Sequence, residues 1–190
     1  RPKPEQWSRM VGGRVGAEAV KVMYSMETPR ESAVASRNKT LKIQRRPPRP
    51  DRVKAAYEML QDSNSKADAI ELAFAKETVM LDALLQKAPI ADVEVQAVQV
   101  GPVVFVSNPA EYFCQYGLDI KQGSGFPLTF PVSLANGCVG YVPTEEALGP
   151  RGGGYETRLS SYSNLIPTAG TTIASEGIAL TKQLQPGVIP

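Results

Sequence analysis

Apolar residues near the start of the chain recur at intervals of three and four, which places them on one face of a helix. They are Trp7, Val11, Val15, Ala19, Val22 and Met26. Pro4 suits the first turn of such a helix, and Pro29 would end it. Gly12, Gly13 and Gly16 weaken a helix interior, so we expect tertiary packing to hold this one.

Further along the chain, segments with the hydrophobic pattern of a strand alternate with segments that have the pattern of a helix. Residues 33–45 read as a polar or edge strand, and a proline-rich connector follows at 46–50. The pattern then predicts helices over 51–61, 66–87, 111–120 and 169–184, and strands over 93–97, 103–106 and 126–134. The continuous apolar run from Val103 to Val106 is typical of a central strand buried on both faces. Thr168 is the expected N-cap of the last helix.

This mixed order of helices and strands predicts an α/β fold, with a layered α+β fold as the alternative. In either case we expect a mixed sheet flanked by helices. Residues 1–50 would hold the first helix, the polar strand and the connector. Residues 51–190 would hold the main α/β part.

The composition is that of a folded domain. Of the 190 residues, 42% are hydrophobic and 21% are charged, which excludes wholesale disorder. No apolar run approaches the roughly 18 to 20 residues that a membrane span needs, so we expect no transmembrane segment. The chain begins at Arg1 rather than Met and shows no signal-peptide pattern. We therefore expect a processed product or a piece of a longer protein.

The net charge of +2 hides an asymmetry along the chain. Residues 1–52 hold 13 Lys and Arg against 5 Asp and Glu, whereas residues 53–190 hold 8 against 14. A basic arm over 30–52 that binds nucleic acid or anionic lipid is one explanation. These basic residues lack interleaved aromatic residues, however. We therefore expect no nucleic-acid partner, and favour either attraction between the two halves of the chain or a basic strand that faces an acidic neighbour.

The chain has no histidine and two cysteines, Cys114 and Cys138. The missing histidine removes the commonest general base, the commonest metal ligand and every catalytic triad that needs one. Two cysteines are too few for a disulfide framework or a four-cysteine zinc site. We expect both to be reduced, half-buried and structural, although a disulfide between them would suit a secreted protein.

Three segments carry candidate chemistry. Glu111 follows the apolar run at a strand end, where ligand sites gather in open sheets. The alternative is a carboxylate that only stabilises the start of a helix. Tyr141 follows a turn rich in small residues, and its alternative role is that of a buried core tyrosine. Tyr155 follows the glycine-rich loop 149–154, which lacks the pattern of a phosphate-binding loop.

Together these segments resemble the carboxyl-terminal part of the catalytic domain of neutral/alkaline ceramidases. That family has a Pro-Gly-Glu segment after a buried strand, then a segment with Leu-x-Asn, Tyr and a Glu-Glu pair, and then a Tyr-Glu stretch. The corresponding segments here run from Asn108 to Glu111, from Leu134 to Glu146 and from Gly153 to Glu156. The resemblance is strongest over residues 100–185.

The resemblance implies a zinc-dependent hydrolase that cleaves an amide bond, such as that of ceramide or another N-acyl lipid. Glu111 and Tyr141 would be zinc ligands, completed by two histidines from far upstream. A zinc-activated water would attack the amide carbonyl, and Tyr155 would contact the substrate carbonyl as its charge develops. A secreted or periplasmic location is also implied.

The chain departs from the family in several places. Ala110 stands where the family commonly has glycine, the interval from Glu111 to Tyr141 is shorter, and a glycine-rich insertion precedes Tyr155. Both histidines are missing. We therefore expect an incomplete part of a larger catalytic domain, inactive alone. Its Zn²⁺ would need histidines from an upstream portion of the domain or a partner chain. The alternative is a non-catalytic structural or binding subunit that keeps the fold.

Overall fold

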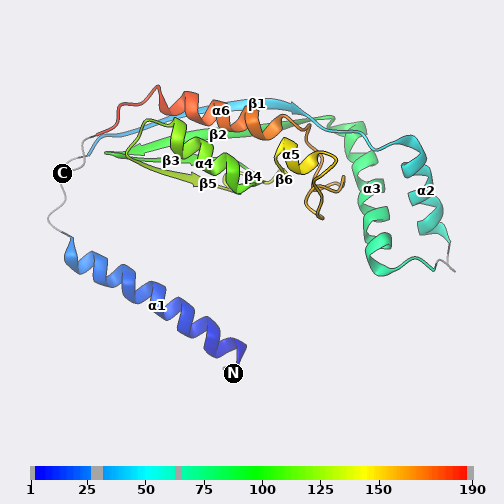
Figure 1. Cartoon of the computed structure of the whole chain (residues 1–190), viewed down its shortest axis with the longest axis horizontal. Coiled ribbons are helices and arrows are strands. Elements are labelled where there is room, and N and C mark those ends of the chain that lie inside the picture. Colours follow the sequence, from blue (N-terminus) through cyan, green and yellow to red (C-terminus); the bar gives the residue numbers. More distant parts are fainter. Residues whose placement is uncertain (1–2, 27–31, 63–65, 188–190) are drawn as a thin grey trace. The chain divides into compact units, whose positions relative to one another are not determined.

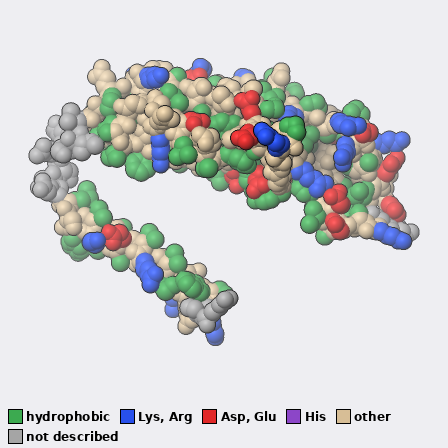
Figure 2. All heavy atoms as spheres, viewed as in Figure 1, with side chains coloured by type: hydrophobic (Ala, Val, Ile, Leu, Met, Phe, Trp, Pro, Cys, Tyr) green, Lys and Arg blue, Asp and Glu red, His purple; other side chains and the backbone are tan. Residues whose placement is uncertain are grey.

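The computed structural model describes residues 3–26, 32–62 and 66–187, and the chain divides into two compact units, Arg1–Ser32 and Ala33–Pro190. The first unit contains α1 (Pro4–Ser25), which has no buried residue. Its hydrophobic side chains lie exposed along the helix (Figure 2). Around Gly12, Gly13 and Gly16, a Cβ atom would meet nothing within 4 Å. The predicted helix is confirmed, and the tertiary packing expected around its glycines stays a prediction.

The second unit is built on a four-stranded mixed sheet in the order β1-β2-β3-β5 (Figure 1). The strands are β1 (Val34–Gln44), β2 (Ile90–Val100), β3 (Val103–Ser107) and β5 (Leu128–Val132). The first three are antiparallel neighbours, whereas β5 runs parallel to β3. A mixed sheet flanked by helices is therefore confirmed, and β1 is the edge strand that its polar pattern predicted.

Two helices, α4 (Cys114–Gly123) and α6 (Ala169–Thr181), cover one face of this sheet. Alternate residues of β2 point into the core beneath them and are buried, as the period of two dictates. Ile120 of α4 and Ile173 of α6 are fully buried there. Burying each such side chain contributes about 1.5–3 kcal/mol. Thr168 occupies the N-cap position of α6, but its hydroxyl makes no capping hydrogen bond.

No helix in the described part of this second unit covers the other face of the sheet. Val104 and Val106 of β3 are buried, but Phe105 between them is 40% exposed. Its ring stacks on that of Phe130 in β5, with the centroids 5.5 Å apart. The prediction that Val103–Val106 is buried on both faces is therefore wrong, because the helices pack on one side only.

A helical hairpin lies between β1 and β2 in sequence and consists of α2 (Pro50–Gln61) and α3 (Ala69–Lys87), which pack against each other. Two residues of the loop before α6 bond to acidic side chains of α3. Arg158 donates two hydrogen bonds of 3.2 Å to the Glu71 carboxylate. The hydroxyl and the backbone amide of Ser161 both donate to Glu77. None of the helices in the described ranges is long and apolar enough to cross a membrane.

The basic residues of β1 have partners within the unit. Lys39 lies 2.6 Å from Glu176 of α6, and Lys42 lies 2.5 Å from Asp92 of β2. The expectation of a basic strand that faces acidic neighbours is confirmed at these two positions. Such exposed pairs contribute little to stability, about 0–1 kcal/mol each.

Candidate functional site

A separate two-stranded sheet brings Glu111 and Tyr141 together. Its strands, β4 (Ala110–Tyr112) and β6 (Gly140–Val142), run parallel, and Glu111 is the register partner of Tyr141. Since paired residues of neighbouring strands project to the same side, the carboxylate and the phenol lie beside each other. The helix predicted over 111–120 begins only at Cys114. Glu111 is therefore a strand residue, and the alternative of a helix-start carboxylate is wrong.

The backbone of residue 162 holds β6 in place. The Tyr141 amide donates to the Tyr162 carbonyl oxygen at 2.9 Å. Gly140, the residue before, has φ +78, and a Cβ atom at this position would lie 1.7 Å from the same carbonyl oxygen. Only glycine combines this conformation with so close an approach.

Four side chains converge above the strand pair and are called here the Glu–Tyr cluster: Glu111, Tyr141, Tyr155 and Tyr162. The Tyr162 hydroxyl donates to Glu111 Oε1 at 2.7 Å. The hydroxyls of Tyr141 and Tyr155 lie 3.3 Å apart. The Tyr141 ring meets those of Tyr155 and Tyr162 edge-on, with centroids 5.6 Å and 5.3 Å away. The structure thus brings together all three residues that the sequence singled out.

Tyr162 is the member of the cluster that the sequence did not reveal. It lies in the serine-rich segment Ser160–Ser163, which has no hydrophobic period, and beyond the Tyr-Glu stretch that carried the resemblance. A tyrosine flanked by small polar residues just before a buried Asn164 is the one local signal of its role.

The segment that follows Tyr162 is anchored to the end of β1. The Arg46 amide donates to the Asn164 carbonyl oxygen at 2.6 Å, and the Ile166 amide donates to the Gln44 carbonyl oxygen at 3.1 Å. Arg45 Nη1 also donates to Asn164 Oδ1 at 2.6 Å. Tyr162 is therefore held by β6 on one side and by this anchored segment on the other.

The surroundings raise the pKa of two tyrosines in the cluster. The pKa of Tyr162 is raised by its hydrogen bond with Cys138 and then by the one with Glu111. The pKa of Tyr141 is raised by its hydrogen bond with Tyr155, then by partial desolvation and by the Glu111 charge. Both phenols therefore stay protonated at neutral pH in this arrangement and can donate hydrogen bonds.

Both cysteines are exposed and free. The expectation of half-buried thiols is wrong because Cys114 lies at the surface start of α4 and Cys138 lies in the turn before β6. Cys138 Sγ lies 3.2 Å from the Tyr162 hydroxyl, at the edge of the cluster.

A hollow of 330 Å³ opens over the cluster and is lined by Glu111, Tyr141 and Glu156, with Phe113 and Leu134 as apolar neighbours. The carboxylate and the phenol are oxygen donors that suit a divalent cation. The described residues contain no group of three His, Cys, Asp or Glu that would hold a metal ion. Within the described residues, the oxygen donors that face this hollow are therefore fewer than a metal site held by this chain alone would need.

Searches against protein-family models and against curated protein sequences find no match. Two solved structures are similar in fold. One is the neutral ceramidase from Pseudomonas aeruginosa, with 14% identity and a TM-score of 0.49, covering 83% of this chain and 30% of that chain. The other is a ceramidase complexed with C2, with 15% identity and a TM-score of 0.50, covering 83% of this chain and 32% of that chain.

At such low identity the likeness concerns the fold alone. This chain spans about a third of the length of the ceramidases that it matches. It has the fold of part of a ceramidase.

Proposed function

We propose that this chain forms the carboxylate–tyrosine side of the active site of a zinc-dependent amide hydrolase of the ceramidase type. The observation that carries the proposal is the pairing of Glu111 with Tyr141 across β4 and β6, with the Tyr155 hydroxyl 3.3 Å from that of Tyr141. The likeness in fold to ceramidases supports it.

Each residue of the cluster would have a distinct role. Glu111 and Tyr141 would hold zinc through a carboxylate and a phenolic oxygen. Tyr162 would orient the Glu111 carboxylate through its hydrogen bond. Tyr155 is 63% exposed at the edge of the cluster, so its hydroxyl, which lies 3.3 Å from that of Tyr141, would be accessible to a substrate carbonyl and would stabilise the developing oxyanion. A bound zinc ion would supply Lewis acidity to the amide carbonyl.

The uncovered face of the main sheet supports an incomplete catalytic domain. Phe105, Leu128 and Phe130 lie on adjacent strands and are each at least 40% exposed. Neighbouring exposed apolar side chains of this size are unusual on the solvent-facing surface of a complete domain. We propose that the histidine-bearing portion of the same domain, or a partner chain that carries it, packs on this face. An N-acyl lipid such as ceramide is the proposed substrate, in a secreted or periplasmic setting.

Analysis of the native material tests the proposal directly. Material isolated with its natural neighbours should contain zinc and a histidine-bearing portion in equal stoichiometry, by metal analysis and intact mass. It should also hydrolyse a fluorescent N-acyl sphingosine, with activity lost on chelation and restored by zinc. Material that carries its neighbours but neither binds zinc nor cleaves the amide would instead favour the non-catalytic subunit.

Two tyrosine variants of the assembled protein should have separable effects. Tyr141→Phe removes a phenolic oxygen from the proposed zinc site, so zinc affinity should fall. Tyr155→Phe should leave zinc bound but lower turnover by about 10²–10³-fold, the cost of losing one oxyanion donor. Zinc content and kcat, measured on both variants, separate the two roles. Equal small losses of stability in both variants, with zinc and turnover unchanged, would contradict the assignment.

Tyr162→Phe is expected to act through Glu111. Losing the 2.7 Å hydrogen bond frees the carboxylate to rotate, and zinc affinity should fall by about 10–100-fold, as for other partners of metal ligands. Competition with a zinc chelator measures this change. Because the Tyr162 backbone and ring remain, the free energy of unfolding should change little. Unchanged zinc affinity would remove Tyr162 from the site.

A further inference from the structure

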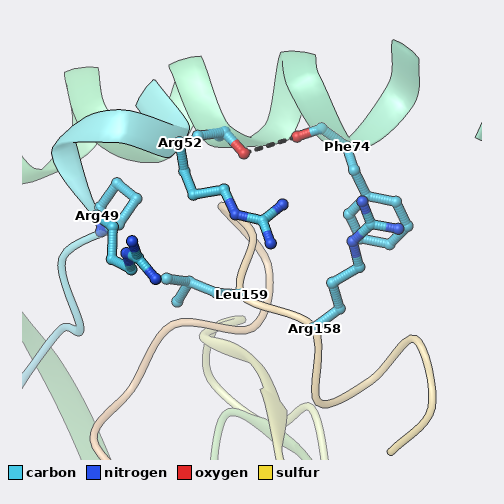
Figure 3. Close-up of a pocket in the computed structure, with 7 residues that line it drawn as sticks. Arg49, Arg52, Phe74, Arg158 and Leu159 are labelled. Carbon is cyan, nitrogen blue, oxygen red and sulfur yellow. Dashed lines mark hydrogen bonds between the residues drawn. The ribbon is translucent and has the colours of Figure 1, made fainter. Parts of the chain in front are cut away.

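A second pocket, of 290 Å³, lies between the α2–α3 hairpin and the loop that carries Tyr155 and Tyr162 (Figure 3). It shares no lining residue with the hollow over the Glu–Tyr cluster. Its wall combines three arginines with three apolar side chains: Arg49, Arg52, Arg158, Pro48, Phe74 and Leu159.

The three arginines reach the pocket from different parts of the chain. Arg49 is the N-cap residue of α2, Arg52 lies in its first turn, and Arg158 comes from the loop more than 100 positions later. Like charges in one place repel each other, and the amino-terminal end of a helix already carries a partial positive charge. The fold therefore gathers positive charge here at some cost, which a bound anion would offset.

Two of the arginines are held by carboxylates. Arg49 makes two hydrogen bonds to Asp51, of 3.0 and 2.8 Å. Arg158 makes two to Glu71, and its guanidinium also lies 3.6 Å from the centroid of the Phe74 ring. Each of these two guanidinium groups is thus paired with a carboxylate through two hydrogen bonds.

Arg52 differs from the other two. Its side chain has no hydrogen bond or ion pair among the residues that the structure describes, and Figure 3 shows it between Arg49 and Arg158. With the carboxylates of Asp51 and Glu71 set against three guanidinium groups, one positive charge is left without a counterion in this pocket.

We infer that this pocket binds a phosphate-bearing organic molecule, with the phosphate group against Arg52, Arg49 and Arg158. A phosphate monoester carries a charge of about −1.5 to −2 at neutral pH and accepts the paired N–H donors of guanidinium groups. Its carbon portion would pack against Pro48, Phe74 and Leu159. The Thr78 hydroxyl donates to the Phe74 carbonyl oxygen at 2.8 Å and is thus already bonded within α3, so this wall offers a ligand apolar contacts.

Calorimetric titration of the full chain at constant ionic strength tests the inference, with phenyl phosphate and inorganic phosphate as probes. Phenyl phosphate should bind saturably and more tightly than inorganic phosphate. Arg52→Gln breaks no hydrogen bond or ion pair with the described residues and should weaken binding by about tenfold or more. Arg37→Gln, on the exposed side of β1, is the matched control and should leave binding unchanged.

Asp51→Asn is expected to strengthen binding, the opposite of the effect of Arg52→Gln. Releasing Arg49 from its carboxylate leaves more positive charge for the ligand, so phenyl phosphate should bind several-fold more tightly. A purely structural role for these residues would not tighten binding.

Phosphatidylcholine vesicles with and without phosphatidic acid distinguish the sources of the phosphate. Binding only to the phosphatidic acid vesicles, lost in Arg52→Gln, would identify a lipid headgroup, whereas binding of phenyl phosphate alone would identify a small molecule.

Three results would overturn the inference. The first is no saturable binding of any phosphate probe. The second is binding that Arg52→Gln leaves unchanged, or that Arg37→Gln weakens equally. The third is equal affinity for inorganic phosphate and phenyl phosphate, which would leave the apolar wall without a role.

Discussion

Gly140→Ala should lower the free energy of unfolding by about 2–5 kcal/mol, the sum of backbone strain at positive φ and steric overlap. The new Cβ atom would lie 1.7 Å from the Tyr162 carbonyl oxygen, which is backbone and cannot move aside as a side chain would. The hydrogen bond from the Tyr141 amide to that oxygen should be lost as residue 162 moves away from β6. Urea denaturation of the full chain measures the change.

Gly125→Ala provides the matched control. Gly125 has nearly the same φ, +76, but a Cβ atom there would meet nothing within 4 Å. Its cost should be limited to backbone strain, about 1–2 kcal/mol. Equal losses in the two variants would show that the contact between residues 140 and 162 is looser than the structure indicates.

Glu111→Gln should abolish zinc binding and hydrolysis in the assembled protein while the fold stays intact. The amide keeps the shape of the side chain and can still accept the hydrogen bond from Tyr162, but it loses the charge that a divalent cation needs. Since the loss of a supporting partner already costs about 10–100-fold in affinity, loss of a ligand should exceed that range. Metal analysis and turnover of the fluorescent amide measure the effect.

Glu146→Gln, on the short helix α5 (Glu145–Leu148) five positions after Tyr141, controls for the removal of one negative charge. It should leave both zinc content and turnover unchanged. Zinc binding and hydrolysis that survive in Glu111→Gln would refute the ligand role of Glu111.

The sequence predicted the elements whose pattern is local. The helical periods placed α1, α2, α3 and α6 within a few residues, and alternation placed β1 and β2. The run at 103–106 was harder, because an apolar residue on the uncovered face, Phe105, looks the same in the sequence as one in the core. Which face of the sheet the helices cover depends on contacts between residues that are far apart in the sequence.

The candidate site shows the same limit. Glu111 follows Asn-Pro-Ala, a pattern that suits the start of a helix, yet its pairing with a strand that lies 30 positions later makes it part of a sheet. The grouping of Glu111, Tyr141 and Tyr155 came from a resemblance and not from periodicity. Tyr162 was not in any of the three motif segments, and its contact with Glu111 depends on the anchoring of residues 164–166 at the end of β1, which the sequence does not show.

The β4–β6 pair is short, and its length affects when the Glu–Tyr cluster forms during folding. The two strands pair over three residues, and no other strand of the described residues joins them. Isolated two-stranded pairs are marginally stable at best, and this one must also close a long intervening loop. The Glu–Tyr cluster should therefore form late in folding, after the main sheet and α4 are in place. In the native state, the free energy needed to open the cluster by local unfolding should be well below the free energy of global unfolding. The geometry of the site should therefore be lost before the core unfolds.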